Sequence, residues 1–546
     1  MSFRNRIFLL FSLSALAVFT ACGSGSGSPV IPTPPPTGGF SNSNLNGTYT
    51  FSISGANANG LFAMAGSFTA CGCSGGTISA GTVDIADPVN GAQSHLALIT
   101  PSSLYSVSAD GRGIAKLFFN TAAASNYEMD LDFVLTSSSH GLIIRYDPNG
   151  TGSGTIDLQD SSVSQSQLAS QFYAYSISGG DFSNASLAGV GVFQLDSTGT
   201  ITSGIADFNY ARNPSADLPL SGSLVVGSGT TPGTASLNTT FSPSPLSFDA
   251  FAIDSTHFKL IETDGQSILV GDALLSPTPS FPSGNLVFTM AGLDSAGSFF
   301  ASGGVVSSDG TSTLSNGAQD VNDNGVVDNQ TNPAMPFSFA GTISEQPTGT
   351  GRWVITLNGF VGGTTFVGYP SNGGLLMLEI DNPTVLGAGV TGGVALQQQS
   401  GVTDLASQGY GLNLTGEDLV NSTEADQIAE FKASSGNLTG TVDVNDGGSL
   451  ATQSLTGTYS ATNGLGSATL KAGFAGMFYY VVDNSTALFI STDTGLPALG
   501  SMEVQTTPSN AATVSAQAAH VLPMFRVIPH GKSAMNPHRT IKLGKK

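Results

Sequence analysis

The sequence has little charge, and most of the charge it has is acidic. Only 10% of its 546 residues are charged, with 37 Asp and Glu against 16 Lys and Arg. Between residues 23 and 523 there are only eight basic residues, and the net charge is −29. Because phosphate binding needs Lys and Arg, this acidic body argues against nucleic acid as a partner. It suits a soluble protein in an extracytoplasmic space.

The residues and motifs of most enzyme classes are also scarce. Aromatic residues make up 8% of the chain and Trp353 is its one tryptophan, which is thin for a carbohydrate-stacking surface. There is no nucleophile elbow, no His-Glu-x-x-His and no phosphate-binding Gly loop. Acidic pairs could serve a glycosidase, but scattered strand-end Asp residues are more simply turn formers. We therefore expect no enzymatic activity, and an extracytoplasmic hydrolase is the weakest alternative.

The first 21 residues are typical of a signal peptide. Two arginines precede an apolar run over residues 7–18, and this run is too short to span a bilayer. Residues 19–22, Phe-Thr-Ala-Cys, resemble a bacterial lipobox, in which small residues precede a cysteine that is lipidated. The resemblance implies that Cys22 becomes the mature N-terminus and carries a diacylglycerol and an amide-linked acyl chain. The alternative is an ordinary secretory signal that leaves Cys22 free.

A Gly-, Ser- and Pro-rich linker over residues 22–40 follows, as suits a flexible tether after an anchor. Each buried methylene contributes about 0.8 kcal/mol, so several acyl chains hold a membrane far better than one. In the lipoproteins that this segment resembles, an Asp after the cysteine favours retention in the inner membrane. Gly23 therefore predicts a lipid-anchored protein of the outer membrane or cell surface.

Four internal repeats are the strongest signal in the sequence. Each repeat opens with a strand-like segment in which large apolar residues alternate with Ser, Thr or Ala, the pattern of a half-buried strand. A Gly-x-x-Asp motif and a strand-ending Asp recur with it every 112 to 124 residues. The opening segments end at Gly55, Gly179, Gly292 and Gly416. The Gly-x-x-Asp aspartates are Asp84, Asp207, Asp320 and Asp443, and the strand-ending ones are Asp147, Asp264, Asp381 and Asp493.

Each repeat reads as all-β. The first holds about eight strand-like runs separated by Gly, Asn, Asp and Ser, with no amphipathic helical pattern between them. This predicts four tandem antiparallel β units of about eight strands each, closed into small barrels rather than immunoglobulin-like sandwiches. We expect each unit to fold by itself. The expected units are residues 41–162, 163–278, 279–402 and 403–508, followed by a basic tail over residues 509–546.

The segments "LNGTYTFSISG", "AGSFTACGCSGGTISAG", "SLTGTYS" and "HGLIIRYDPNGTGSG" carry a resemblance to a known group. They resemble uncharacterised bacterial outer-membrane-type lipoproteins built of tandem Gly-rich all-β repeats. The resemblance covers nearly everything from Asn44 to Gln505 and implies an exported, all-β protein without implying an activity. A likeness to lipocalin barrels concerns shape only, because no diagnostic lipocalin motif is present.

Two cysteines and two histidines are candidates for a redox, metal or structural role. Cys71 and Cys73 flank a glycine on an expected turn, where they form either a local disulfide or two inert thiols. No third cysteine or nearby histidine completes a zinc set. His140 and His257 occupy the same repeat position, where the other repeats have Gly and Thr, so we interpret them as structural.

The segment "DVNDNGVVD" resembles a calcium loop, and calcium is the only cofactor weighed. Its oxygen donors fall at loop positions 1, 3, 5 and 9, and Gly325 falls at position 6, where a tight turn is needed. Thr331 stands where a bidentate Glu is required, and an Asx-rich hairpin loop is the alternative. The candidate ligands are Asp320, Asn322, Asn324 and Asp328.

The last 21 residues contain six basic residues and no acidic one. This segment either lies on the acidic body or reaches an anionic partner. Taken together, the sequence predicts a non-enzymatic, lipid-anchored surface scaffold or binding protein whose ligand is unknown. The alternative is a lipocalin-like binder of small ligands, which would need a cavity in a barrel instead of a filled interior.

Overall fold

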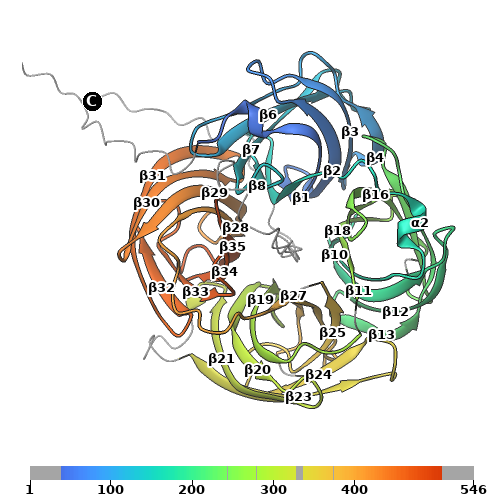
Figure 1. Cartoon of the computed structure of the whole chain (residues 1–546). Coiled ribbons are helices and arrows are strands. Elements are labelled where there is room, and N and C mark those ends of the chain that lie inside the picture. Colours follow the sequence, from blue (N-terminus) through green and yellow to red (C-terminus); the bar gives the residue numbers. More distant parts are fainter. Residues whose placement is uncertain are drawn as a thin grey trace, which may run out of the picture. The chain divides into compact units, whose positions relative to one another are not determined.

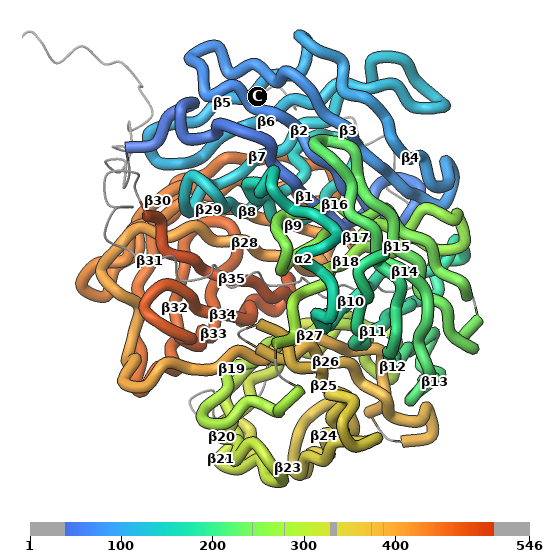
Figure 2. Tube along the Cα trace, turned by 45° about the vertical axis from the view of Figure 1, so that its right-hand side comes forward, coloured from blue at the N-terminus to red at the C-terminus, as the bar shows by residue number. Residues whose placement is uncertain are grey.

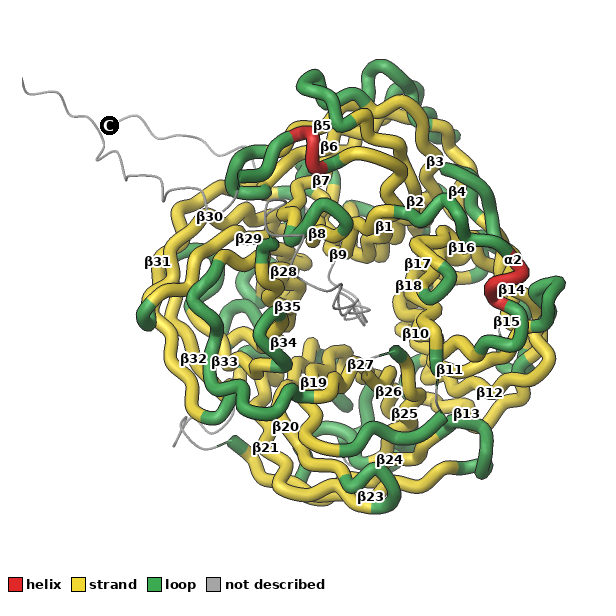
Figure 3. The backbone as a smooth tube through the Cα atoms, viewed as in Figure 1, coloured by secondary structure: helices red, strands yellow, loops and turns green. Residues whose placement is uncertain are grey.

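Strands make up most of the computed structural model, which describes residues 39–506 except 243, 278, 328–335, 373 and 386. All of these residues fall in one compact unit. The short helix α2 (Gln165–Leu168) and the 3-10 turn η1 (Asn42–Asn44) stand out from the strands in Figure 3. No helix in this described part is long and apolar enough to cross a membrane. The predicted signal peptide, the predicted lipidation site Cys22 and the basic tail lie outside the described residues.

Four modules follow one another along the chain, from blue to orange-red in Figure 1. Module 1 comprises β1 (Asn46–Asn57), β2 (Gly60–Cys71), β3 (Ile78–Asp87), β4 (Gly91–Ala97), β5 (Leu104–Val107), β6 (Arg112–Phe119), β7 (Tyr127–Leu135), β8 (His140–Arg145) and β9 (Gly150–Leu158). Module 2 comprises β10 (Phe172–Asp181), β11 (Ser186–Leu195), β12 (Ile201–Tyr210), β13 (Asn213–Pro219), β14 (Ser221–Val225), β15 (Gly233–Asn238), β16 (Leu246–Asp254), β17 (His257–Glu262) and β18 (Ser267–Leu275). Module 3 comprises β19 (Gly284–Leu293), β20 (Phe299–Ser308), β21 (Thr313–Asp323), β22 (Val326–Val327), β23 (Phe337–Glu345), β24 (Trp353–Asn358), β25 (Thr365–Ser371), β26 (Gly374–Glu379) and β27 (Val390–Gln397). Module 4 comprises β28 (Gly409–Asp418), β29 (Thr423–Ser434), β30 (Asn437–Asp446), β31 (Ser449–Thr462), β32 (Leu465–Leu470), β33 (Gly476–Val481), β34 (Thr486–Ser491) and β35 (Ala498–Val504).

Each module is one antiparallel sheet in which the first strand pairs with both the second and the last. In module 4 the eight strands close into a barrel. In module 3 the pairing of β20 with β21 closes eight strands, with β22 added outside. In modules 1 and 2 the nine-stranded sheet stays open at one seam, which the isolated bridges Thr77–Leu104 and Thr200–Ser223 span. The prediction of four antiparallel, barrel-like β units is confirmed.

The region of the fourth strand explains why some modules have nine strands and module 4 has eight. Modules 1 and 2 split this part of the chain into two strands, whereas module 4 runs through it with β31, which is 14 residues long. The sequence does not predict β4, whose residues "GAQSHLA" are nowhere fully buried. A strand without an apolar face leaves no alternation to detect.

The barrel interiors are filled by large apolar side chains. Tyr49, Phe51 and Ile53 of the first strand point into the core of module 1 and are at most 1% exposed. The equivalent residues of the other modules enter cores of the same kind. The alternation seen in the sequence therefore marks the inward face of each first strand, as expected.

The outward face of the first strands is buried as well, so the expectation of half-buried strands is wrong. Thr50 and Ala174 point away from their barrels and are fully buried. The reason is that neighbouring modules cover these faces, for example where Thr50 Oγ1 donates to Ala252 O of module 2. Small side chains at these outward positions let two sheets approach closely.

A glycine in each last strand lies opposite the first strand of the same module. A Cβ at Gly154 would come within 1.7 Å of Ser52 O, and one at Gly500 within 1.9 Å of Asn413 O. Gly271 and Gly393 meet the corresponding carbonyls of modules 2 and 3 at 1.9 and 2.0 Å. Only glycine fits so close to a neighbouring backbone, which explains why this residue recurs in every repeat.

Candidate functional site

The modules contact one another in a closed circuit. Apolar clusters join module 1 to module 2, module 2 to module 3, module 3 to module 4, and module 4 back to module 1. In the last of these contacts, β8 and β9 lie against β28 and β29 (Figure 2). The modules therefore share buried surface and do not behave as beads on a string.

The repeated Gly-x-x-Asp aspartate lies at each of these four contacts. It stands on the third strand of its module, points outward, and is at most 8% exposed in all four modules. A buried carboxylate needs a cation or hydrogen-bond donors, and these come largely from the next module. In the sequence this residue is a repeat marker, and no role is predicted for it from its spacing alone. The structure places it in the contacts between barrels.

Between modules 2 and 3 the partner is an arginine. Arg352 binds Asp207 through Nε at 2.8 Å and Nη2 at 2.7 Å, and Tyr369 donates its hydroxyl to the same carboxylate. Both ionic side chains are buried, at 5% and 0% exposure. This two-pronged geometry is the strongest form of a carboxylate–guanidinium contact.

The next two contacts use related partners. Tyr480 of module 4 donates to Asp320 Oδ2 at 2.8 Å. Arg112 of module 1 lies 3.5 Å from Asp443 Oδ2, and Thr452 donates to Oδ1 of the same carboxylate. Asp132 of module 1 lies in this contact too. Burial, reinforced by the charge of Asp443, raises its pKa to about 8.

An asparagine two residues after the aspartate adds a second clamp in three modules. Asn209, Asn322 and Asn445 each donate their side-chain amide to a backbone carbonyl at the end of the second-to-last strand of the following module. The distances are 2.8–2.9 Å. The sequence carries a signal for this clamp, because Asp-x-Asn recurs at these three places and is missing from module 1, where Ala86 replaces the asparagine.

This clamp bears on the predicted calcium loop. Asp320 and Asn322 face module 4, where Asp320 accepts from Tyr480 and Asn322 donates to Ser491 O and Asp493 O. Asn324 occupies the turn after β21 at φ 50°, and Asp328 lies outside the described residues. The calcium site stays a prediction, and the structure gives two of its four residues a role in joining modules.

The contact between modules 1 and 2 is built differently. Asp84 accepts the backbone N–H of His95 at Oδ1, and His95 Nε2 lies 2.9 Å from Oδ2 of Asp249 in module 2. Burial, reinforced by Asp249, raises the pKa of Asp84 to about 8. Within the described residues, these three side chains are the group close enough together to hold a metal ion.

A network of buried charges joins modules 1, 2 and 4. His140 contacts Asp157 through Nδ1 at 2.6 Å and Glu503 of module 4 through Nε2 at 2.9 Å. Lys259 of module 2 lies 3.2 Å from Asp157 Oδ2 and 3.8 Å from Asp272. Burial alone would lower the pKa of His140, but the two carboxylates outweigh it and raise that pKa to about 10. Burial opposes ionisation of Asp157 as well, yet Lys259 and His140 lower its pKa.

The two histidines interpreted as structural are thus buried, and each contacts a buried carboxylate. His257 opens β17 as His140 opens β8, and its Nε2 lies 2.7 Å from Asp272. The carboxylates that face them are not predicted by the sequence pattern. They come from neighbouring strands and, for Glu503, from another module.

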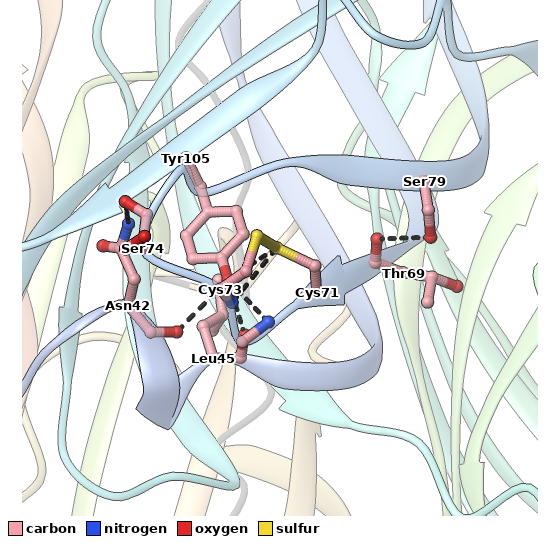
Figure 4. The surroundings of a disulfide bond; sticks show 9 residues. Asn42, Leu45, Thr69, Cys71, Cys73, Ser74, Ser79 and Tyr105 are labelled. Atoms are coloured by element: carbon pink, nitrogen blue, oxygen red, sulfur yellow. Dashed lines mark hydrogen bonds between the residues drawn. A yellow bond between two sulfur atoms is a disulfide. The ribbon is translucent and has the colours of Figure 1, made fainter.

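Cys71 and Cys73 are joined by a disulfide at the end of β2 (Figure 4). The backbone N–H of Gly72 between them donates to the Tyr105 hydroxyl at 2.9 Å, and that hydroxyl donates to Leu45 O. Cys73 is exposed and Cys71 is half-buried. The disulfide therefore closes a surface turn that is tied to Tyr105 of β5.

The interior of module 3 holds an apolar cavity of about 40 Å³. Its wall includes Phe288, Met290, Phe339 and Phe366. Drug-sized ligand sites have volumes of roughly 300–1,000 Å³, so this cavity is far smaller.

Comparison with known proteins identifies no relatives by sequence. No family model matches the chain, and no curated protein matches it. Solved structures that resemble the chain do so weakly, as three examples show. A protein given the name AttH from Nitrosomonas europaea is 12% identical, with a TM-score of 0.17, over 46% of this chain and 100% of that one. Intact Ap-TbpB (N and C lobes) is 8% identical, with a TM-score of 0.18, over 89% and 98%. CghA with Sch210972 is 10% identical, with a TM-score of 0.15, over 87% and 96%. At these scores the likenesses support no inference about function.

Replacing Arg352 by Met should destabilise the protein by about 3–5 kcal/mol, because Asp207 is left buried without its cation. Trp353, next in the chain, reports on this contact, so unfolding in urea followed by tryptophan fluorescence measures the loss. The control Lys116→Met removes an exposed ion pair with Glu128 and Asp130 and should cost no more than about 1 kcal/mol. Equal losses in the two variants would contradict this account.

The network around His140 predicts a loss of stability in alkali. Because its pKa is raised in the folded state, its contribution is complete below the unfolded pKa of about 6.5 and disappears as pH rises through about 10. Wild type should therefore be more stable than His140→Gln at pH 6, and the gap of a few kcal/mol should narrow towards pH 10. Urea unfolding of both proteins across this range tests the prediction. A gap that stays constant with pH would contradict it.

Proposed function

We propose that this protein is an exported, lipid-anchored scaffold or binding protein of the cell envelope, without enzymatic activity. The observation that carries the proposal is the closed circuit of module contacts, in which buried polar side chains fix four barrels to one another. Such an assembly presents its outer surfaces in a fixed arrangement, which suits binding or spacing more than catalysis. In this proposal the protein belongs with the tandem-repeat lipoproteins that its sequence resembles.

Four features support the proposed location. The lipobox-like segment ends at Cys22, the linker that follows suits a tether, and Gly23 favours the outer membrane or cell surface. A disulfide between Cys71 and Cys73 is typical of a protein in an oxidising compartment.

The basic tail over residues 509–546 is the only strongly basic segment of the sequence. We propose that it contacts either the acidic body or an anionic partner outside it.

Small-ligand binding is a second candidate because of the cavity in module 3. Its wall is wholly apolar, so its ligand would be apolar too. A volume of about 40 Å³ admits only a very small molecule unless the barrel opens. The packed interiors of the other modules make this candidate the weaker of the two.

Fractionation of a bacterium that expresses the full chain tests the anchor. Wild type should pellet with outer membranes and yield an acylated N-terminal peptide that begins at Cys22. Cys22→Ala should be released from the membrane pellet, because the acylated thiol is lost. The double variant Cys71→Ser and Cys73→Ser is a matched control, since it removes thiols without touching the leader, and it should stay in the pellet. Recovery of Cys22→Ala with membranes, and no acyl mass on wild type, would overturn the proposed location.

A further inference from the structure

We propose that Asp84, His95 and Asp249 bind a divalent transition-metal ion of the zinc type between modules 1 and 2. One ligand atom from each of the three residues lies within 4.8 Å of the others. Asp84 stands on β3, His95 on β4 and Asp249 on β16, so the ion would join two modules. This site is independent of the proposed anchor and scaffold function.

The first argument is an arginine that two of the other three contacts have and this one lacks. Strand pairing places Arg112 and Arg352 at the same position, just before or at the start of the sixth strand, and both reach the aspartate of the preceding module. In module 2 the same position holds Pro232, which precedes β15. At this contact a second carboxylate, Asp249, faces the repeated aspartate, so the negative charge doubles where the arginine is lost.

The second argument is a buried oxygen with no hydrogen-bond partner. Asp84 is 1% exposed, and its Oδ1 accepts from His95 N at 2.5 Å. Within the described residues, its Oδ2 accepts no hydrogen bond. The equivalent carboxylates of the other modules accept a hydrogen bond from an arginine, a tyrosine or a threonine. Leaving a buried carboxylate oxygen unsatisfied is costly, so this atom calls for a cation.

The backbone at His95 turns its side chain towards the two carboxylates. His95 has φ 57°, a left-handed conformation that is unusual for a residue with a side chain. Asp217 has φ 59° at the equivalent bulge of module 2, and its N–H likewise donates to the repeated Asp207. The bulge is thus part of the module design, while a histidine on it is particular to module 1. With its side chain 57% exposed, His95 can reorient to a metal and leave a coordination position to water.

The donor set selects the class of ion. One imidazole nitrogen and two carboxylate oxygens suit Zn²⁺ and its first-row neighbours, whereas Ca²⁺ and Mg²⁺ prefer oxygen donors alone. Three protein ligands leave a fourth tetrahedral position open. A proton is the competing cation, because burial and Asp249 raise the pKa of Asp84 to about 8, so that a protonated Asp84 could bond to Asp249 instead.

Isothermal titration calorimetry of the metal-free full chain with Zn²⁺ alone tests the site. The chain also has His520, His530 and His538 in its tail, so the comparison is made in a background where these three are Ala. This background should bind one Zn²⁺ per chain and melt at a higher temperature with it. His95→Ala and Asp249→Asn should each weaken binding by about 100-fold or more, since losing even an indirect partner of a ligand costs about 10- to 100-fold.

A second readout separates a metal site from a structural role. Without Zn²⁺, Asp249→Asn should melt no lower than the background, because it removes one of two facing buried carboxylates. With Zn²⁺ it should lose the stabilisation that the background gains. Because the side chain of His95 is largely exposed, His95→Ala should fold normally, and it serves as the second variant that lacks a metal ligand. Unchanged Zn²⁺ affinity in both variants, or no Zn²⁺ binding in the background, would overturn the proposal in favour of a shared proton.

Discussion

The burial of one carboxylate per module, on the third strand and facing the next barrel, is the constraint on which the structure depends. A buried carboxylate is costly alone, so each contact between modules must bring donors to it. Arg352 and Tyr369 do so for Asp207, Tyr480 for Asp320, and Arg112 for Asp443. Burying this group therefore makes each barrel depend on its neighbour, while apolar clusters supply the area that drives the association.

Much of the unusual composition follows from this arrangement. Strands buried on both faces need large residues inside the barrel and Ser, Thr, Ala or Gly outside it, which explains the high Gly content and the scarcity of charge. The few basic residues of the body are correspondingly well placed. Arg352, Lys259 and Arg145 are all nearly fully buried against carboxylates, so they serve the structure and not an external partner.

The sequence predicts more of the fold than of the candidate site. Alternation in the first strands and the even spacing of Gly-x-x-Asp identified four antiparallel barrel-like units, because both patterns recur in every repeat of the sequence. The edge strand β4 could not be predicted, because it has no apolar face. The pairing of Asp84 with Asp249, or of His140 with Glu503, could not be predicted, because it depends on how one barrel docks on another. Only the Asp-x-Asn clamp left a readable pattern, in three repeats.

The central claim is that the four barrels are stabilised together, so the sequence-based expectation of separately folding units can be tested directly. Differential scanning calorimetry of the full chain is the most direct measurement. The account predicts one cooperative transition in which the calorimetric and van't Hoff enthalpies agree. Several resolved transitions, each with the enthalpy of a unit of roughly 115 residues at about 0.7 kcal/mol per residue, would contradict it.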